Sequence, residues 1–153
     1  MSFSGRPTHL IDHPIPNDGF WPDLDVAEFQ RSYRLPAEYL LELLVDGLTT
    51  AMHEVNNDLA KRKADWQRAD IHQVSRADPM VLPERHFYVA SYKRAVYCRA
   101  KSFLLSQFAT VNRRESAQNL AKEAPDTAEQ FLAFSQQAVR LIQGRSRITS
   151  ELI

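Results

Sequence analysis

The first residues to test for chemistry are His9, Asp12 and His13, whose side chains are typical metal ligands. Two imidazoles four residues apart would share one face of a helix and could bind a metal ion together. Pro14 and Pro16 follow directly and argue against a helix over these residues, and no cysteine accompanies them. We therefore favour a surface segment over a metal site and predict no bound metal.

Residues that could carry catalysis are few. The single cysteine, Cys98, lies among apolar neighbours in a helical pattern, so we expect a buried, unreactive thiol beside Tyr97 on the packed face of that helix. Four carboxylates could suggest an acid and base pair, but they recur as the solvated face of a predicted helix: Glu54, Asp58, Asp65 and Asp70. The four glycines stand too far apart to build a phosphate-binding loop. We predict neither enzymatic activity nor a cofactor.

Basic side chains gather in the second half of the chain. They could bind a phosphate backbone, because each such contact adds salt-dependent affinity that does not depend on base sequence. The competing interpretation is an ordinary solvated helix face. The candidate contacts with DNA are Arg94, Lys101, Arg113 and Arg114.

The charges of the chain cancel, but their distribution is uneven. The 153 residues carry 19 basic and 19 acidic side chains. Residues 1–60 hold three basic and ten acidic groups, whereas residues 93–122 hold seven basic and one acidic. Such regions could attract the opposite charges of a neighbouring copy, or the basic one could face phosphates. With 44% apolar residues, the composition is that of a globular protein, and no apolar run is long enough to cross a membrane.

Proline and glycine divide the chain into three regions. Four prolines and two glycines within residues 1–24 exclude a regular helix, so we expect an extended N-terminal arm. Its apolar residues, Phe20 and Trp21 among them, need a surface to lie against, and that surface could belong to another copy. Residues 25–144 form the predicted helical domain, and residues 145–153 alternate as in a β-capable tail.

Apolar residues within 25–144 recur at steps of three and four, which is the pattern of amphipathic helices. Capping-box spacings, a proline suited to a first turn and a glycine suited to a left-handed cap mark the helix ends. These signals are Asp25 with Glu28, Asn112 with Glu115, Asp126 with Glu129, Pro36 and Gly144.

These patterns predict an all-α fold, a small bundle of about four to five helices. One predicted helix is long, because residues 36–66 would span roughly 45 Å at about 1.5 Å per residue. It could protrude or break, and Gly47 is its weak point. The expected helices cover 26–34, 36–66 and 84–108, with two more beginning near 112 and 126, the last ending at Gly144, and a linking loop over 70–83.

Several stretches of the sequence have the residues and order of a known family. Residues 17–25, Asn-Asp-Gly-Phe-Trp-Pro-Asp-Leu-Asp, resemble the opening of the family of head-completion (GPL) proteins of peduovirus-type tailed phages. Residues 93–101, Lys-Arg-Ala-Val-Tyr-Cys-Arg-Ala-Lys, resemble its central helix, and residues 52–56 resemble the helix before it. Residues 144–153 close the chain as the family does, so the likeness covers residues 17–153 in the same order and spacing.

This resemblance implies a structural virion protein, made in the host bacterial cytoplasm, that acts after DNA packaging. It would stabilise the filled head beneath the portal protein and offer a docking surface to a tail-completion protein. By analogy with helical head-tail adaptors, we expect a ring of about twelve copies around the DNA channel. The residues also leave a second function class open, a helical DNA-binding or regulatory module without enzymatic activity.

A closed ring needs heterologous contacts, in which different patches of neighbouring copies meet. The acidic and basic regions, the apolar arm and the tail could supply such patches, the tail by adding a strand to a neighbour. The candidate contacts with a neighbouring subunit or with the portal are Phe20, Trp21, Arg145, Arg147, Ile148, Leu152 and Ile153.

Overall fold

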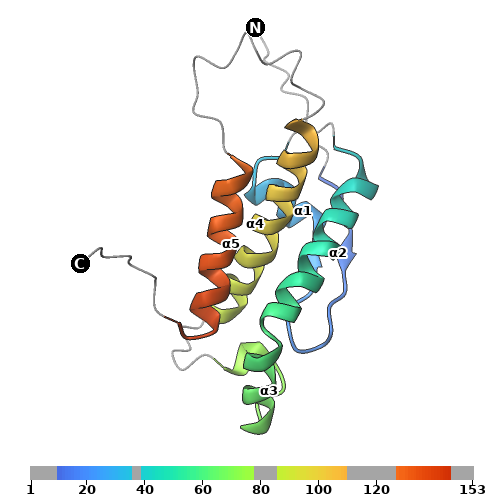
Figure 1. The fold of residues 1–153 in the computed structure, drawn as a ribbon. Coiled ribbons are helices and arrows are strands. Elements are labelled where there is room, and N and C mark those ends of the chain that lie inside the picture. The colour runs from blue at the N-terminus through green and yellow to red at the C-terminus, as the bar shows by residue number, and fades with distance from the viewer. Residues whose placement is uncertain (1–9, 36–38, 78–85, 110–126, 146–153) are drawn as a thin grey trace, which may run out of the picture.

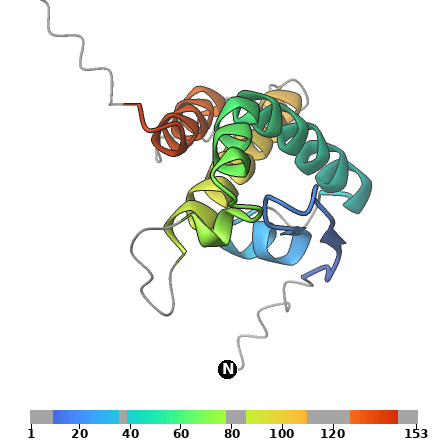
Figure 2. The same ribbon diagram turned by 90° about the horizontal axis from the view of Figure 1, so that it is seen from below.

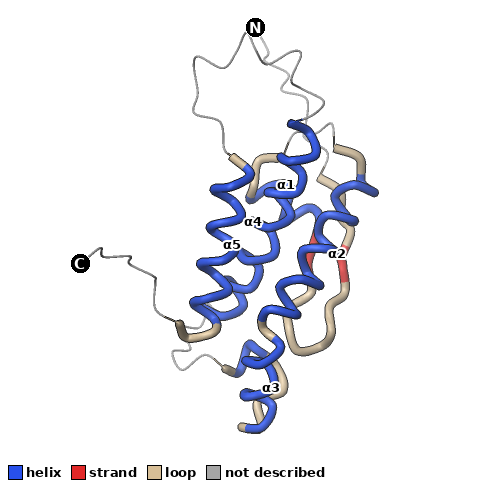
Figure 3. The backbone as a smooth tube through the Cα atoms, in the orientation of Figure 1, coloured by secondary structure: helices blue, strands red, loops and turns tan. Residues whose placement is uncertain are grey.

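The computed structural model of the chain describes residues 10–35, 39–77, 86–109 and 127–145. Within these ranges it is mainly helical, with two very short strands beside the first helix (Figures 1 and 3). The all-α fold class and the small helical bundle are confirmed. The elements are β1 (Pro14–Ile15), β2 (Leu24–Asp25), α1 (Val26–Ser32), α2 (Leu41–Asp58), α3 (Ala60–Arg68), the 3-10 turn η1 (Val74–Arg76), α4 (Phe87–Ala109) and α5 (Ala128–Ile142).

Helix α4 is the centre of the bundle, with α1, α2 and α5 packed around it (Figures 1 and 2). Its apolar residues do not form a single stripe, and Ala95, Val96, Ala100 and Leu104 are all buried. A helix that is apolar on several sides is covered on several sides. Helices α2 and α5 lie on opposite flanks of α4, and α5 runs antiparallel to it (Figure 1). In the described parts of the chain, no helix has the length and apolar character needed to span a membrane.

The N-terminal segment is extended, as predicted, but it packs on its own chain. Strands β1 and β2 pair antiparallel, with Ile15 opposite Leu24, and both of these side chains are buried. Trp21 is only 2% exposed, and its ring stacks on Tyr92 of α4 at 4.8 Å between centroids. Phe20 packs edge-on against Trp21. The prediction that these two rings rest on another copy is therefore corrected, because burial within the chain leaves almost none of their surface free.

The predicted helix over 36–66 starts later and breaks once. It begins at Leu41 as α2, and the backbone leaves helical geometry at Leu59 before α3 begins. Gly47 is not the weak point: it lies inside α2, where Leu104 of α4 covers it. The break turns α3 so that Trp66 packs against Phe20, with ring centroids 6.1 Å apart. The packing of the Trp66 ring sets the direction of α3. No helix-breaking residue lies at the break.

The C-terminal half agrees with the predicted pattern apart from small shifts. α4 occupies Phe87–Ala109 where 84–108 was expected. The capping box of α5 is formed by Thr127 with Gln130, one residue after the predicted pair. Gly144 has a φ of 71°, the left-handed geometry expected just past the helix end. The predicted helix beginning near 112 and the tail from residue 146 lie outside the described residues.

The packing of the N-terminal segment yields the first prediction. Replacing Trp21 by alanine removes a buried ring from between Phe20 and Tyr92, so the free energy of unfolding should fall by about 3 to 5 kcal/mol. Leu40→Ala is the control, because Leu40 is 70% exposed. Chemical denaturation of both variants measures the difference. Equal stabilities would mean that residues 14–25 do not belong to the core.

Candidate functional site

Three sequence segments meet in a polar network between the N-terminal segment, α2 and α4. The side-chain amide of Asn17 donates to the Tyr92 hydroxyl at 2.8 Å and to the backbone carbonyl of Pro22 at 2.9 Å. Asn56 of α2 donates to Asn17 Oδ1 at 3.0 Å, and the Tyr92 hydroxyl donates to Asn56 Oδ1. The side chains of Asn17, Asn56 and Tyr92 thus bind one another, which is what a buried polar network requires.

Asp18 organises the turn that carries the two buried rings. Its Oδ1 accepts from the backbone N–H groups of Phe20 and Trp21, both at 3.0 Å, and its Oδ2 pairs with Lys63 of α3 at 2.8 Å. Gly19 supplies the positive φ of 86° that this turn needs. Partial burial opposes ionisation of Asp18, but the Lys63 ammonium and the two amides outweigh it and hold the pKa of the carboxyl below its ordinary value.

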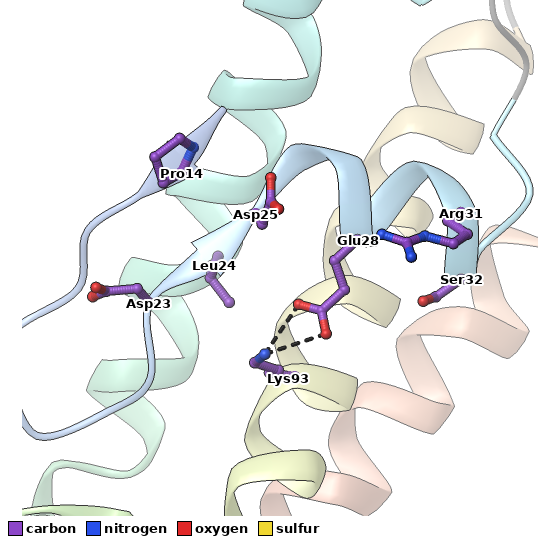
Figure 4. A pocket seen from close by; sticks show the side chains of 8 residues that line it. All are labelled: Pro14, Asp23, Leu24, Asp25, Glu28, Arg31, Ser32 and Lys93. Atoms are coloured by element: carbon purple, nitrogen blue, oxygen red, sulfur yellow. Dashed lines mark hydrogen bonds and ion pairs between the residues drawn. The ribbon is translucent and has the colours of Figure 1, made fainter. Parts of the chain in front are cut away.

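A second cluster joins α1 to α4 (Figure 4). Asp25 caps α1 by accepting from Ala27 N–H, as predicted. Glu28 does not complete a capping box; it reaches to α4, where it pairs with Lys93 at 3.0 Å and accepts from the Tyr97 hydroxyl at 2.7 Å. An open pocket lies beside this cluster, lined by Pro14, Asp23, Leu24, Asp25, Glu28, Arg31, Ser32 and Lys93.

Arg99 is a buried cation that ties three helices together. Its guanidinium, on α4, binds Asp58 of α2 at 2.9 Å and Glu54 at 3.5 Å. Its Nε donates at 3.1 Å to the hydroxyl of Ser135, a fully buried residue of α5. Glu54 and Asp58 were expected to be a plain solvated face, and they are half exposed, but both of them also hold this arginine.

These groups are suited to holding helices together and not to moving protons. Burial raises the pKa of the Tyr92 hydroxyl, and burial together with the hydrogen bond to Glu28 raises that of Tyr97. Burial also raises the pKa of the Cys98 thiol, which is covered as predicted. A thiol kept protonated is a poor nucleophile. Among the described residues, no group of three or more His, Cys, Asp or Glu side chains could hold a metal ion.

The structure separates the predicted DNA contacts. Arg94 is exposed on α4, with its guanidinium 5.7 Å from the ring centroid of Phe134. Lys101 is only 8% exposed, and its ammonium donates to the Tyr33 carbonyl at 3.0 Å and lies over the ring of Phe131. Lys101 is therefore corrected to a structural cation. The other two candidates, Arg113 and Arg114, lie outside the described residues.

Of the predicted subunit contacts, Arg145 alone is described and exposed, directly after the Gly144 cap. Phe20 and Trp21 are in the core, and Arg147, Ile148, Leu152 and Ile153 lie outside the described residues. The sequence reasoning missed an exposed apolar pair on α5, Phe134 and Leu141. Their seven-residue spacing was the available signal, because it places them on one helix face.

Several residues of these clusters, Asn17, Asn56 and Tyr97 among them, lie in segments whose sequence resembles phage head-completion proteins. The sequence profile of the family described as "Phage head completion protein (GPL)" matches residues 15–153. The chain belongs to this family. It is 30% identical over 145 residues to the "Probable head completion/stabilization protein" of Haemophilus phage HP1 (strain HP1c1), a match that covers 95% of each chain. No solved structure matches the chain.

Membership of the GPL family makes this chain a phage head completion protein and a component of the phage particle. The family consists of structural proteins. Three residues of the stretches that resemble the family, Asn17, Asn56 and Tyr97, hold the N-terminal segment, α1 and α2 on α4. In the described residues, these three side chains thus belong to the scaffold of the fold.

The depressed pKa of Asp18 yields a pH prediction. Its ionised form stabilises the fold above the ordinary carboxyl pKa of about 4, and this stabilisation is lost as the pH falls through the lower folded-state pKa. Asp18→Asn should therefore cost about 0.5 to 1 kcal/mol near neutral pH and almost nothing in acid. Urea denaturation across this pH range tests it, with Asp12→Asn as the exposed control. A cost that does not change with pH would contradict the role of the carboxylate.

Proposed function

We propose that this head completion protein forms a ring around the DNA channel beneath the portal, where it stabilises the filled head and joins it to the tail. The observation that supports the proposal most is the match to the named head completion/stabilization protein of phage HP1 over 95% of both chains. The ring of about twelve copies, and the portal and tail-completion proteins as partners, rest on analogy with helical adaptors.

The fold supports a passive part in the particle. Buried ionisable side chains bind one another or the backbone and so fix the positions of α1, α2, α4 and α5. A part that stabilises a filled head without chemistry needs such rigid packing, since well-packed interiors deform little and transmit strain. The alternative, a DNA-binding regulatory module, gains no support from Lys101, whose charge is used inside the fold.

The net charges of whole sequence regions do not predict attraction between copies, because several of these charges pair within one chain. Acidic groups of the first 60 residues and basic groups of the central part already pair within the chain, through Lys93 with Glu28, Arg99 with Asp58 and Lys63 with Asp18. Each of these pairs reduces the charge that is left for a neighbour. Subunit contacts must be sought among the side chains that remain exposed.

Contact with packaged DNA remains a proposal for Arg94, Arg113 and Arg114. Each arginine that meets a phosphate would add salt-dependent affinity without reading bases. This contact would be an accessory to the ring and is not needed for a role in closing the head.

A phage that carries a stop codon in this gene tests the proposed function. Heads should still package DNA, but they should lose it or stay without tails, as counted by electron microscopy and by nuclease-protected DNA. Supplying the protein from a plasmid should restore filled, tailed particles. A cryo-EM map of the restored particle should show the ring beneath the portal. Tailed, stable particles without the protein would overturn the proposal.

A further inference from the structure

One face of the bundle exposes large apolar side chains beside a cation. Phe134 and Leu141 on α5 are 36% and 43% exposed, and Phe87 at the start of α4 is 51% exposed. Arg94 lies seven residues after Phe87, hence on the same face of α4, and its guanidinium stands over the Phe134 ring. The exposed residues of α4 therefore lie next to those of α5. We name these four residues the outer α4–α5 face.

This face is electrostatically positive. The 23 residues of α4 contain no Asp or Glu, and the one acidic residue of α5, Glu129, lies in its first turn, at the end away from Leu141. Arg145, which follows the Gly144 cap of α5, is exposed at the Leu141 end. A symmetric pairing of two such faces would bring Arg94 and Arg145 of both copies together, and like charges brought together across an interface oppose binding. A partner that covers this face should be acidic.

The opposite flank of the bundle supplies acidic groups beside an exposed leucine. Helix α2 has four carboxylates and no lysine or arginine in 18 residues. Glu54 and Asp58 bind Arg99, whereas Glu42 and Asp46 are exposed one turn apart. Leu40, at the start of the same helix, is 70% exposed. We name Leu40, Glu42 and Asp46 the acidic end of α2. Figure 1 shows α2 and α5 on opposite sides of α4.

We propose that the outer α4–α5 face of one copy packs against the acidic end of α2 of a second copy. Apolar side chains would then be covered on both sides, and Arg94 would meet carboxylates in place of another arginine. Two different patches on opposite flanks make a heterologous contact, which closes into a ring when the rotation between copies allows it. This inference rests on the proposed ring and names its subunit contact.

Cysteine cross-linking in assembled particles tests this contact. A chain carrying both Phe134→Cys and Asp46→Cys replaces the wild-type protein, and intact particles are treated with a short bismaleimide. Cys98 is buried and does not compete. We expect a ladder of dimers, trimers and larger multimers. A chain with Phe134→Cys and Arg76→Cys is the matched control, because Arg76 is exposed on η1, and it should stay monomeric.

The outcomes separate the contact from the proposed ring. Particles that contain the doubly substituted protein at the wild-type level but give no ladder would overturn the contact and leave the ring standing. Stable, tailed particles that lack the wild-type protein would overturn both. Cross-linked dimers from Phe134→Cys alone would show that two α5 faces pair with each other and would also overturn the contact.

Charge reversal distinguishes a second copy from other occupants of this face. Arg94→Glu and Asp46→Arg should each weaken incorporation into particles by at least about tenfold, and the two changes in one chain should restore it, because the carboxylate and the guanidinium exchange places. Thermal melting confirms that each variant folds. Loss of incorporation that the double variant does not restore would instead assign Arg94 to DNA or to the portal and would contradict the contact.

Discussion

Two phenol groups on α4 constrain the rest of the fold. Tyr92 and Tyr97 are buried, and a buried hydroxyl needs a hydrogen-bond partner. Tyr92 meets this need with Asn17 and Asn56, and Tyr97 meets it with Glu28. These partners come from the N-terminal segment, α2 and α1. Helix α4 thereby fixes two helices and the N-terminal segment by contacts that apolar packing alone would not specify.

The same constraint determines which surfaces remain for assembly. Because Lys93, Arg99 and Lys101 bind groups inside the chain, the basic central sequence leaves Arg94 as its exposed cation on the described part of α4. Because α1, α2 and α5 cover α4, few of its described residues are exposed: Phe87, Ala90 and Arg94 in its N-terminal half, where Arg94 adjoins Phe134, and Ser106 and Gln107 near its C-terminal end.

Local signals in the sequence predicted local structure well. Helical spacing gave the fold class, Asp25 marked the start of α1, and Gly144 marked the end of α5, because caps depend on a few neighbouring residues. The break at Leu59 could not be predicted, since it depends on Trp66 reaching Phe20 across 46 residues of sequence. The burial of Lys101 could not be predicted for the same reason, because its partner, the Tyr33 carbonyl, lies on another element.

The N-terminal segment shows the limit of composition as a guide. Prolines and glycines correctly excluded a helix, but they could not say which surface would cover Phe20 and Trp21. The covering surface is formed by Tyr92 and Trp66, two aromatic residues that lie far from the segment in the sequence. The stretches that resemble the family lie apart in the sequence, and only the structure shows that residues of two of them, Asn17 and Asn56, meet each other and Tyr92.

Native-state hydrogen exchange tests most directly whether residues 14–25 belong to the core. The Val26 amide bonds to His13 O and the Val74 amide to Phe20 O, so both report on this segment. They should exchange only through global unfolding, with the same free energy as the amide of Val96 in the centre of α4. Exchange at much lower free energy would show that the N-terminal segment opens independently, and the account of α4 as the organising helix would then be wrong.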